Sequence, residues 1–276
     1  MVSTMYEIIK ALNKIKFLKI TVIVLCAMLL LASCKMLLFS SGKNDKNSMT
    51  MTTAKKGEVV IYATGSGVMT INWGNGTKSK ARITALERND TLLNNHRYSH
   101  TYSKASANII TISGENITLL GCWDNQLTEL DVSKNSVLTR LACDNNQLTE
   151  LDVSKNYALT GLGCNNNKLT KLDVSKNYSL TILNCGDNPL TELDVNKNIV
   201  LASLFCYNNQ LEKLDVKGAF SLRRLECWNN LLEAPMLNDL FVTLNRNHKS
   251  SIVIGGNPGA SDCDQSIAES KGWIVQ

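Results

Sequence analysis

Histidine is scarce in this sequence, with three among 276 residues, so a common catalytic and metal-binding side chain is nearly absent. Neither a phosphate loop nor a dinucleotide-binding pattern occurs among its 16 glycines. No nucleophile with a base, and no triad of metal ligands, stands at a recognisable spacing. The sequence therefore predicts no catalytic residue and no cofactor, and it argues against an enzyme.

A strong net charge is also missing. The formal charge is +5 at pH 7, and residues 1–33 supply +3 of it through four lysines and one glutamate, which leaves about +2. This remainder is too small for an electrostatic grip on phosphate groups, so nucleic acid is not an expected partner. With 44% hydrophobic and 19% charged residues, the chain has the composition of a globular protein with a core.

The longest hydrophobic run lies near the amino terminus. Lysines at positions 10–19 precede the apolar segment 20–33, which is typical of a secretory signal peptide. Residues 31–34, Leu-Ala-Ser-Cys, resemble the lipobox of bacterial lipoproteins, which implies acylation of Cys34 after cleavage at residue 33. We therefore expect an exported protein of the bacterial cell envelope, lipid-anchored to the outer membrane on its periplasmic or surface side. An uncleaved anchor is the alternative, because residues 36–39 extend the run to about 20 residues.

The middle of the chain repeats with a period of 21 residues. One unit, at 138–156, reads Leu-Thr-Arg-Leu-Ala-Cys-Asp-Asn-Asn-Gln-Leu-Thr-Glu-Leu-Asp-Val-Ser-Lys-Asn. The apolar positions of one unit cannot bury themselves alone, so neighbouring units must stack. We predict a solenoid of about six coils over residues 117–234. Its ladder cysteines are Cys122, Cys143, Cys164, Cys185, Cys206 and Cys227.

The pattern Leu-x-x-Leu-x-Cys-x-x-Asn-x-Leu resembles the bacterial leucine-rich repeats, most closely the internalin type with a cysteine ladder. The likeness implies an α/β or mostly β solenoid, with one short parallel strand per coil lining a concave face. The second half of each unit fits nearly the same template; we assign the strand to the cysteine half. Asparagines at one position per coil are expected to satisfy backbone groups of the turns, namely Asn125, Asn146, Asn167, Asn188, Asn209 and Asn230.

The ladder cysteines are predicted to be free thiols buried in one internal file. Metal sites usually take cysteines in close Cys-x-x-Cys pairs, which this sequence lacks, so no metal is expected. Neighbouring cysteines on registered parallel strands point the same way, which suits a disulfide poorly. Cys263 lies outside the ladder and is either an exposed thiol or part of a terminal cap.

The segments that flank the repeats differ from them. Residues 34–56 are rich in Ser, Asn, Lys and Thr, which favours a flexible tether. Residues 57–116 hold alternating strand patterns, with Gly-Ser-Gly as a hairpin turn. Their motifs at 73–76 and 100–102 resemble the PKD family, which implies a small immunoglobulin-like β domain or N-terminal cap. Residues 235–276 combine helix, strand and turn signals and are predicted to form an α/β C-terminal cap.

An acidic ladder and a lysine ladder also follow the period. Such stripes are usually solvated surface, and one carboxylate per coil lacks the clustered oxygen ligands that calcium prefers. We therefore expect neither ladder to bind a metal. The acidic ladder consists of Asp131, Asp152, Asp173, Asp194 and Asp215.

Outward strand positions are where such a solenoid would contact a ligand, because inward positions are committed to the core. They place a group of aromatic side chains at the carboxy-terminal end of the sheet, whereas the glycine-rich middle coils look featureless. Exposed rings with polar neighbours are typical of protein or sugar recognition sites, although these rings could simply pack together. The candidate binding residues are Trp123, Phe205, Tyr207, Arg224, Glu226 and Trp228.

The sequence thus predicts a non-enzymatic, membrane-tethered leucine-rich repeat protein that recognises another protein through its concave face. Two alternatives stay open. One is a glycan-binding or adhesion lipoprotein that uses the aromatic end of the solenoid. The other is a structural component of the cell envelope.

Overall fold

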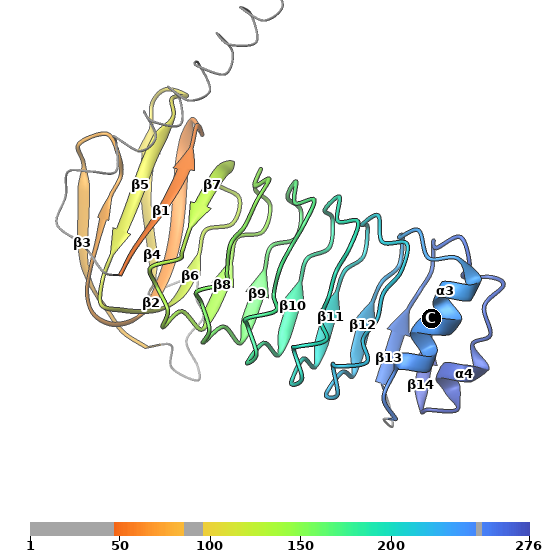
Figure 1. Ribbon diagram of the computed structural model, residues 1–276. Coiled ribbons are helices and arrows are strands. Elements are labelled where there is room, and N and C mark those ends of the chain that lie inside the picture. Colours follow the sequence, from red (N-terminus) through yellow and green to blue (C-terminus); the bar gives the residue numbers. More distant parts are fainter. Residues whose placement is uncertain (1–46, 86–95, 247–249) are drawn as a thin grey trace, which may run out of the picture. The chain divides into compact units, whose positions relative to one another are not determined.

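The computed structural model of the protein describes residues 47–85, 96–246 and 250–276 (Figure 1). The predicted signal, Cys34 and the first part of the predicted tether lie outside these residues, as does His248. The described chain runs from an amino-terminal group of antiparallel strands into a row of parallel strands, and then into a segment with two helices.

The repeats form a leucine-rich repeat solenoid, which confirms the predicted fold. Adjacent strands pair in parallel with a 21-residue register, so that Leu141 lies opposite Leu162 and Leu162 opposite Leu183. The strands lie in the cysteine half of each coil, as assigned, and each ends one residue before its cysteine. These strands are β8 (Arg140–Ala142), β9 (Gly161–Gly163), β10 (Ile182–Asn184), β11 (Ser203–Phe205) and β12 (Arg224–Glu226).

The core of each coil is built from both of its halves. In one coil Leu141 and Cys143 from the strand half, and Leu148 and Val153 from the other half, are all buried. The six ladder cysteines are buried free thiols, as predicted. Burial raises the pKa of a thiol because it disfavours the charged thiolate, and it raises the pKa of Cys185 to about 12. The ladder thiols therefore act as small apolar side chains.

Alkylation of the native protein tests this buried file. We expect iodoacetamide to leave the six ladder cysteines unmodified, because the reagent needs an accessible thiolate. Cys263 is only partly buried and is expected to react first among the described cysteines. Peptide mass mapping, before and after denaturation in guanidinium chloride, measures the alkylation rates of Cys263 and of the ladder cysteines. Ladder cysteines that react in the native protein as fast as Cys263 would contradict the buried file.

The predicted asparagine ladder is confirmed. The Asn146 side-chain amide donates to the carbonyls of Cys122 and Cys143, at 3.1 and 2.9 Å, and its Oδ1 accepts the N–H of Leu127 at 3.0 Å. The residue before it, Asn145, has φ of 54°, a left-handed conformation that asparagine tolerates well. Each such asparagine therefore joins its own turn to the coil before it.

A second asparagine ladder lies in the other half of the coils. The side-chain amide of Asn177 donates to the carbonyls of Val153 and Asn156, at 3.0 and 2.9 Å. Its Oδ1 is buried without a hydrogen-bond partner in the described structure. The two ladders therefore have different numbers of hydrogen bonds. The second ladder consists of Asn135, Asn156, Asn177 and Asn198.

The strands before the repeats are joined to the solenoid through β6. This strand pairs antiparallel with β2 and parallel with β8, so the amino-terminal strands and the repeats share one continuous sheet. The strands are β1 (Ser48–Thr53), β2 (Gly57–Asn72), β3 (Lys78–Ile83), β4 (Arg97–Tyr102), β5 (Asn108–Ser113), β6 (Asn116–Gly121) and β7 (Leu127–Asp131).

The prediction of a flexible tether through residue 56 is wrong for residues 48–53. These residues form β1, which lies between β5 and β7 and pairs antiparallel with both. Met49 and Met51 alternate with serine and threonine, so that one side of the strand is buried and the other is polar. The β structure therefore begins before residue 57.

The predicted Gly-Ser-Gly hairpin is also wrong. Strand β2 continues through these residues, pairing with β4 and β6 in its first part and with β3 and β5 in its second. Gly65 and Gly67 have φ of 154° and 89°, and a Cβ atom on Gly65 would lie 1.8 Å from the Asn116 carbonyl oxygen. The glycines let one long strand bend between the part that pairs with β4 and β6 and the part that pairs with β3 and β5.

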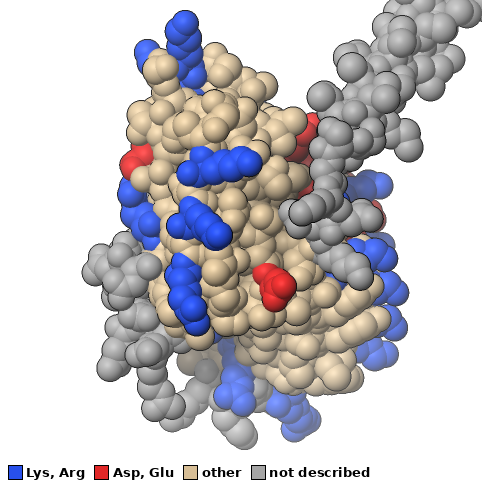
Figure 2. Space-filling model, turned by 90° about the vertical axis from the view of Figure 1, so that its left-hand side faces the viewer, with Lys and Arg blue, Asp and Glu red and all other residues tan. Residues whose placement is uncertain are grey.

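Strand β3 forms a basic edge on this part of the molecule. Among the described strands it pairs only with β2, and its exposed side chains are Lys78, Lys80 and Arg82. Figure 2 looks onto this end and shows lysine and arginine side chains set in a row on a largely uncharged surface. Charged side chains on an edge strand disfavour its pairing with a strand of another chain. This role explains the row of basic side chains, and no bound ligand is needed to explain it.

The residues after the repeats form α3 (Ala234–Thr243), β13 (Ser250–Val253), α4 (Ser266–Glu269) and β14 (Trp273–Val275). Strands β13 and β14 extend the parallel sheet beyond β12. Helix α3 buries Leu237, Leu240 and Phe241, and Cys263 packs at the edge of the same core. Within the described ranges, no helix has the length and apolar character needed to cross a bilayer.

Candidate binding face

The outward side chains of the parallel strands form three columns, which we call the sheet face. The strict register of the strands places equivalent residues of successive coils side by side. The first column is Leu119, Arg140, Gly161, Ile182, Ser203 and Arg224. The second is Gly121, Ala142, Gly163, Asn184, Phe205 and Glu226. The third, directly after the cysteines, is Trp123, Asp144, Asn165, Gly186, Tyr207 and Trp228.

A hollow of about 440 Å³ lies in the sheet face over β6, β8, β9 and β10. Its floor includes Ala142, Gly161 and Gly163, which have little or no side chain. Trp123 borders it on the side of β6, and Ile182 borders it on the side of β10. Because the neighbouring coils carry larger residues in the same columns, the small residues leave a depression between them. Half of the Ile182 side chain is exposed, which adds an apolar rim.

The polar groups around the hollow can orient a ligand. Arg140 and Asp144 supply one charge of each sign. Desolvation by burial raises the pKa of the Asp144 carboxyl above its ordinary value, although the N–H of Asn165 donates to its Oδ1 at 3.2 Å. The amide of Asn184 donates to Oδ1 of Asn165 at 3.0 Å. The hollow thus combines a small apolar floor with fixed donors and acceptors, as small recessed binding sites usually do.

An aromatic cluster follows the hollow on β11 and β12. The rings of Tyr207 and Trp228 are stacked, with centroids 4.6 Å apart and planes at 4°. Tyr207 also lies against Gly186, where a Cβ atom would come within 2.6 Å of its ring. The Arg224 guanidinium lies 5.0 Å from the centre of the Phe205 ring. The same guanidinium donates two hydrogen bonds to the Glu226 carboxylate. These five candidate residues are therefore brought together, and their rings also pack on one another.

Trp123 lies apart from the other five candidates. Its ring stacks on Tyr62 of β2, with centroids 4.4 Å apart and planes at 6°. It also covers Gly121, where a Cβ atom would lie 2.2 Å from the ring. Trp123 therefore forms the amino-terminal border of the hollow rather than part of the aromatic cluster.

The sequence pattern does not predict the hollow, because the middle coils look featureless in it. The signal was present in the sequence as glycine at positions 161 and 163, both in outward columns. Glycine offers no side chain for recognition, yet a group of glycines beside larger residues creates a recess. Only the register of neighbouring coils shows that Gly163 lies beside Ala142, and that Gly161 lies between Arg140 and Ile182.

The motifs at 73–76 and 100–102 come together away from the sheet face. The Tyr102 hydroxyl donates to the carbonyl of Trp73 at 2.5 Å, and the His100 ring stacks on the Trp73 ring with centroids 5.3 Å apart. Asn75 and His100 share a hydrogen bond of 2.8 Å. His100 thus has a packing role. The described residues contain no group of three acidic, histidine or cysteine side chains placed to hold a metal ion.

No family model matches this chain, and no curated protein matches it. Among solved structures it is similar to the functional domain of InlJ from Listeria monocytogenes, which includes a cysteine ladder. The identity is 31%, the match covers 62% of this chain and 51% of that one, and the TM-score is 0.39.

Two further solved structures are similar. The leucine-rich repeat protein LIC12759 from Leptospira interrogans is 24% identical over 46% of this chain and 33% of that one, with a TM-score of 0.39. The internalin InlF from Listeria monocytogenes is 21% identical over 51% and 42%, with a TM-score of 0.41. The chain thus spans about half or less of the length of the proteins that it matches.

Proposed function

We propose that this chain is a non-catalytic binding protein whose sheet face recognises another protein. The observation that carries the proposal is the hollow between Trp123 and Ile182, with its apolar floor and polar border. A side chain that projects from a partner would fill the hollow, and the flat strands around it would supply the rest of the contact. The hydrogen-bonded strands hold these residues rigidly, so little ordering entropy is lost on binding.

The aromatic cluster extends the same surface. The Tyr207 ring lies against Gly186 and stacks on the Trp228 ring. These contacts within the protein leave little of the Tyr207 ring surface for a partner. Arg224 remains exposed beside them and offers hydrogen-bond donors to a partner. Aromatic and arginine side chains are common at the energetic centres of protein interfaces. The cluster and the hollow together give a surface long enough for a protein ligand.

A glycan is the second candidate ligand. Trp228 is partly exposed, and the residue that follows it in its column is Gly255, which has no side chain to cover the ring. An exposed tryptophan face is a suitable platform for a sugar ring. The hollow favours a protein, whereas the Trp228 face favours a glycan.

The place of the protein in the cell is also part of the proposal. The lysine-rich start, the apolar run and the Leu-Ala-Ser-Cys sequence support an anchor of acyl chains on Cys34 at the envelope of a bacterium. The joined motifs around Trp73 and Tyr102 support a PKD-like origin of the amino-terminal strands. An anchored chain of this kind would present its sheet face to partners on one side of the membrane.

Photocross-linking on intact cells tests the proposed binding face. A photoreactive phenylalanine analogue replaces Ile182 on the border of the hollow, and a second variant carries it at Tyr178. These residues have matched exposures, 50% and 52%, but Tyr178 lies outside the sheet face. We expect residue 182 to give a discrete adduct with another protein and residue 178 to give none.

Three outcomes would contradict the proposal that the sheet face binds a protein. An adduct that resists protease but is lost after glycosidase treatment would replace the protein ligand by a glycan. The same adducts from both positions, or none from residue 182 at full photoprobe incorporation, would reject the sheet face as the binding surface.

A further inference from the structure

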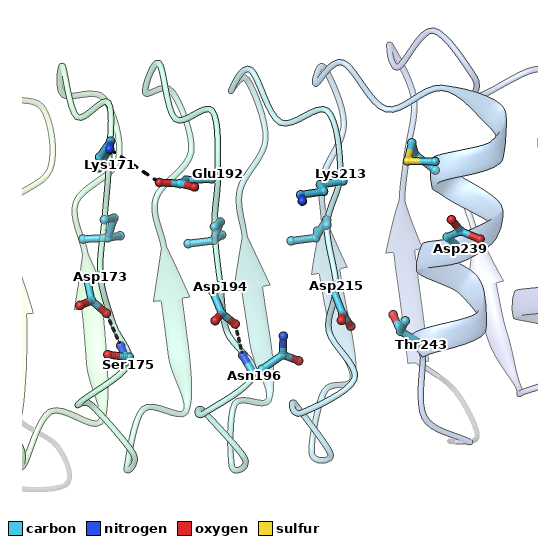
Figure 3. A pocket seen from close by; sticks show the side chains of 14 residues that line it. Lys171, Asp173, Ser175, Glu192, Asp194, Asn196, Lys213, Asp215, Asp239 and Thr243 are labelled. Atoms are coloured by element: carbon cyan, nitrogen blue, oxygen red, sulfur yellow. Dashed lines mark hydrogen bonds and ion pairs between the residues drawn. The ribbon is translucent and has the colours of Figure 1, made fainter.

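A second groove lies across the core from the sheet face, where the other halves of three coils meet helix α3 (Figure 3). Its volume is about 770 Å³. We call it the acidic groove. The buried residues Leu172, Leu193 and Leu214 line its apolar floor. Met236, Asp239 and Thr243 of α3 line its carboxy-terminal end, where Figure 3 shows Asp239 and Thr243 on the helix.

Two rows of charged side chains run beside the leucines. One row is Lys171, Glu192 and Lys213, and the other is Asp173, Asp194 and Asp215. Lys171 and Glu192 lie 3.9 Å apart as an exposed pair. With Asp239 on the opposite wall, the lining holds five carboxylates against two lysines, so the potential over the apolar floor is negative.

The aspartates are held in place by the turns that follow them. Oδ1 of Asp173, Asp194 and Asp215 accepts the backbone N–H two residues later, in each case at 2.8 Å. Hydrogen bonds from Ser175 lower the pKa of Asp173, so this carboxylate stays charged under mildly acidic conditions. The turn thus fixes a file of carboxylates, one per coil, along the groove.

We propose that the acidic groove binds an extended basic segment of a partner polypeptide. Apolar side chains of the segment would lie on the leucine floor, and its lysine or arginine side chains would pair with the aspartate file. The described residues contain no cluster of acidic side chains suited to a metal ion, which argues against a cation as occupant. This site is separate from the sheet face and does not depend on the function proposed for it.

The spacing of the coils indicates how often a basic residue should occur in the bound segment. Neighbouring coils are about 4.8 Å apart, so Asp173 and Asp215 are separated by about 9.6 Å. A polyproline II segment advances about 9.3 Å in three residues. A basic residue at every third position therefore comes into register with every second aspartate.

Fluorescence anisotropy with a labelled synthetic peptide tests the proposal on the full-length chain. The probe has four Lys-Leu-Pro units, and a matched peptide has glutamate in place of lysine. We expect saturable binding of the lysine peptide only, weakened by salt because exposed ion pairs are screened. The double variant Asp173→Asn, Asp215→Asn should lower the affinity at least about tenfold, since it removes two charges while asparagine keeps the acceptor of each turn.

The matched control is the double variant Asp131→Asn, Asp152→Asn. These aspartates occupy the same position of the repeat and accept the same type of backbone hydrogen bond, but they do not line the groove. The control should bind the peptide like the unmodified chain. Equal losses in the two double variants, equal binding of the glutamate peptide, or no saturable binding of the lysine peptide would each overturn the proposal.

Discussion

Replacement of Asn167 by alanine is expected to lower the free energy of unfolding by about 3–5 kcal/mol, because it leaves several buried backbone groups without partners. The Asn167 amide donates to the carbonyls of Cys143 and Cys164, at 3.1 and 3.0 Å. Its Oδ1 accepts the N–H of Leu148 at 3.0 Å. The loss is comparable to a large part of the stability of an ordinary domain. Guanidinium unfolding followed by circular dichroism measures it.

The matched variant is Asn177→Ala in the second ladder. Asn177 donates to two carbonyls, but its Oδ1 is buried without a partner, so alanine also removes an unfavourable group. We expect a loss of about half or less of that at Asn167. An equal loss in both variants would show that the difference in hydrogen bonding between the ladders does not control stability.

The sequence was sufficient to predict the solenoid because every coil carries the same local pattern. A period of 21 residues puts each cysteine at the same place in its coil, and stacking is the only way to bury so many leucines. The burial of Cys143 and the hydrogen bonds of Asn146 follow from this pattern without knowledge of distant contacts. Repetition therefore made the core and its polar ladder predictable.

The errors occurred where structure depends on partners that are distant in the sequence. Residues 48–53 contain only two clearly apolar side chains, and they become a strand because β5 and β7 provide edges on both sides. The bend at Gly65 is set by the close carbonyl of Asn116. The hollow likewise depends on Ala142, Gly161 and Gly163 from two neighbouring strands. A local sequence pattern does not show which residues from distant segments come into contact.

Replacement of Gly161 by tyrosine is expected to weaken partner binding strongly while the fold is kept. A Cβ atom at Gly161 would contact only Cγ of Arg140, at 3.8 Å, so the position has room for a side chain. Tyrosine also suits an exposed strand position better than glycine, so stability should be unchanged or higher by up to about 1 kcal/mol. Its ring would occupy the hollow, and we expect affinity for a partner that uses the hollow to fall at least about tenfold.

Ser251→Tyr is the matched control. Ser251 lies in the same column on β13, opposite Arg224, and does not line the hollow. Tyrosine there adds the same ring to the same kind of strand position. Both variants should show the circular dichroism spectrum and unfolding midpoint of a folded solenoid.

The most direct test of the sheet face is an equilibrium titration of the partner captured through residue 182 against three proteins: the unmodified chain, Gly161→Tyr and Ser251→Tyr. We predict that Gly161→Tyr binds at least about tenfold more weakly than the unmodified chain, and that Ser251→Tyr binds with the unmodified affinity. The same affinity for all three folded proteins would contradict the assignment of the hollow as the recognition site.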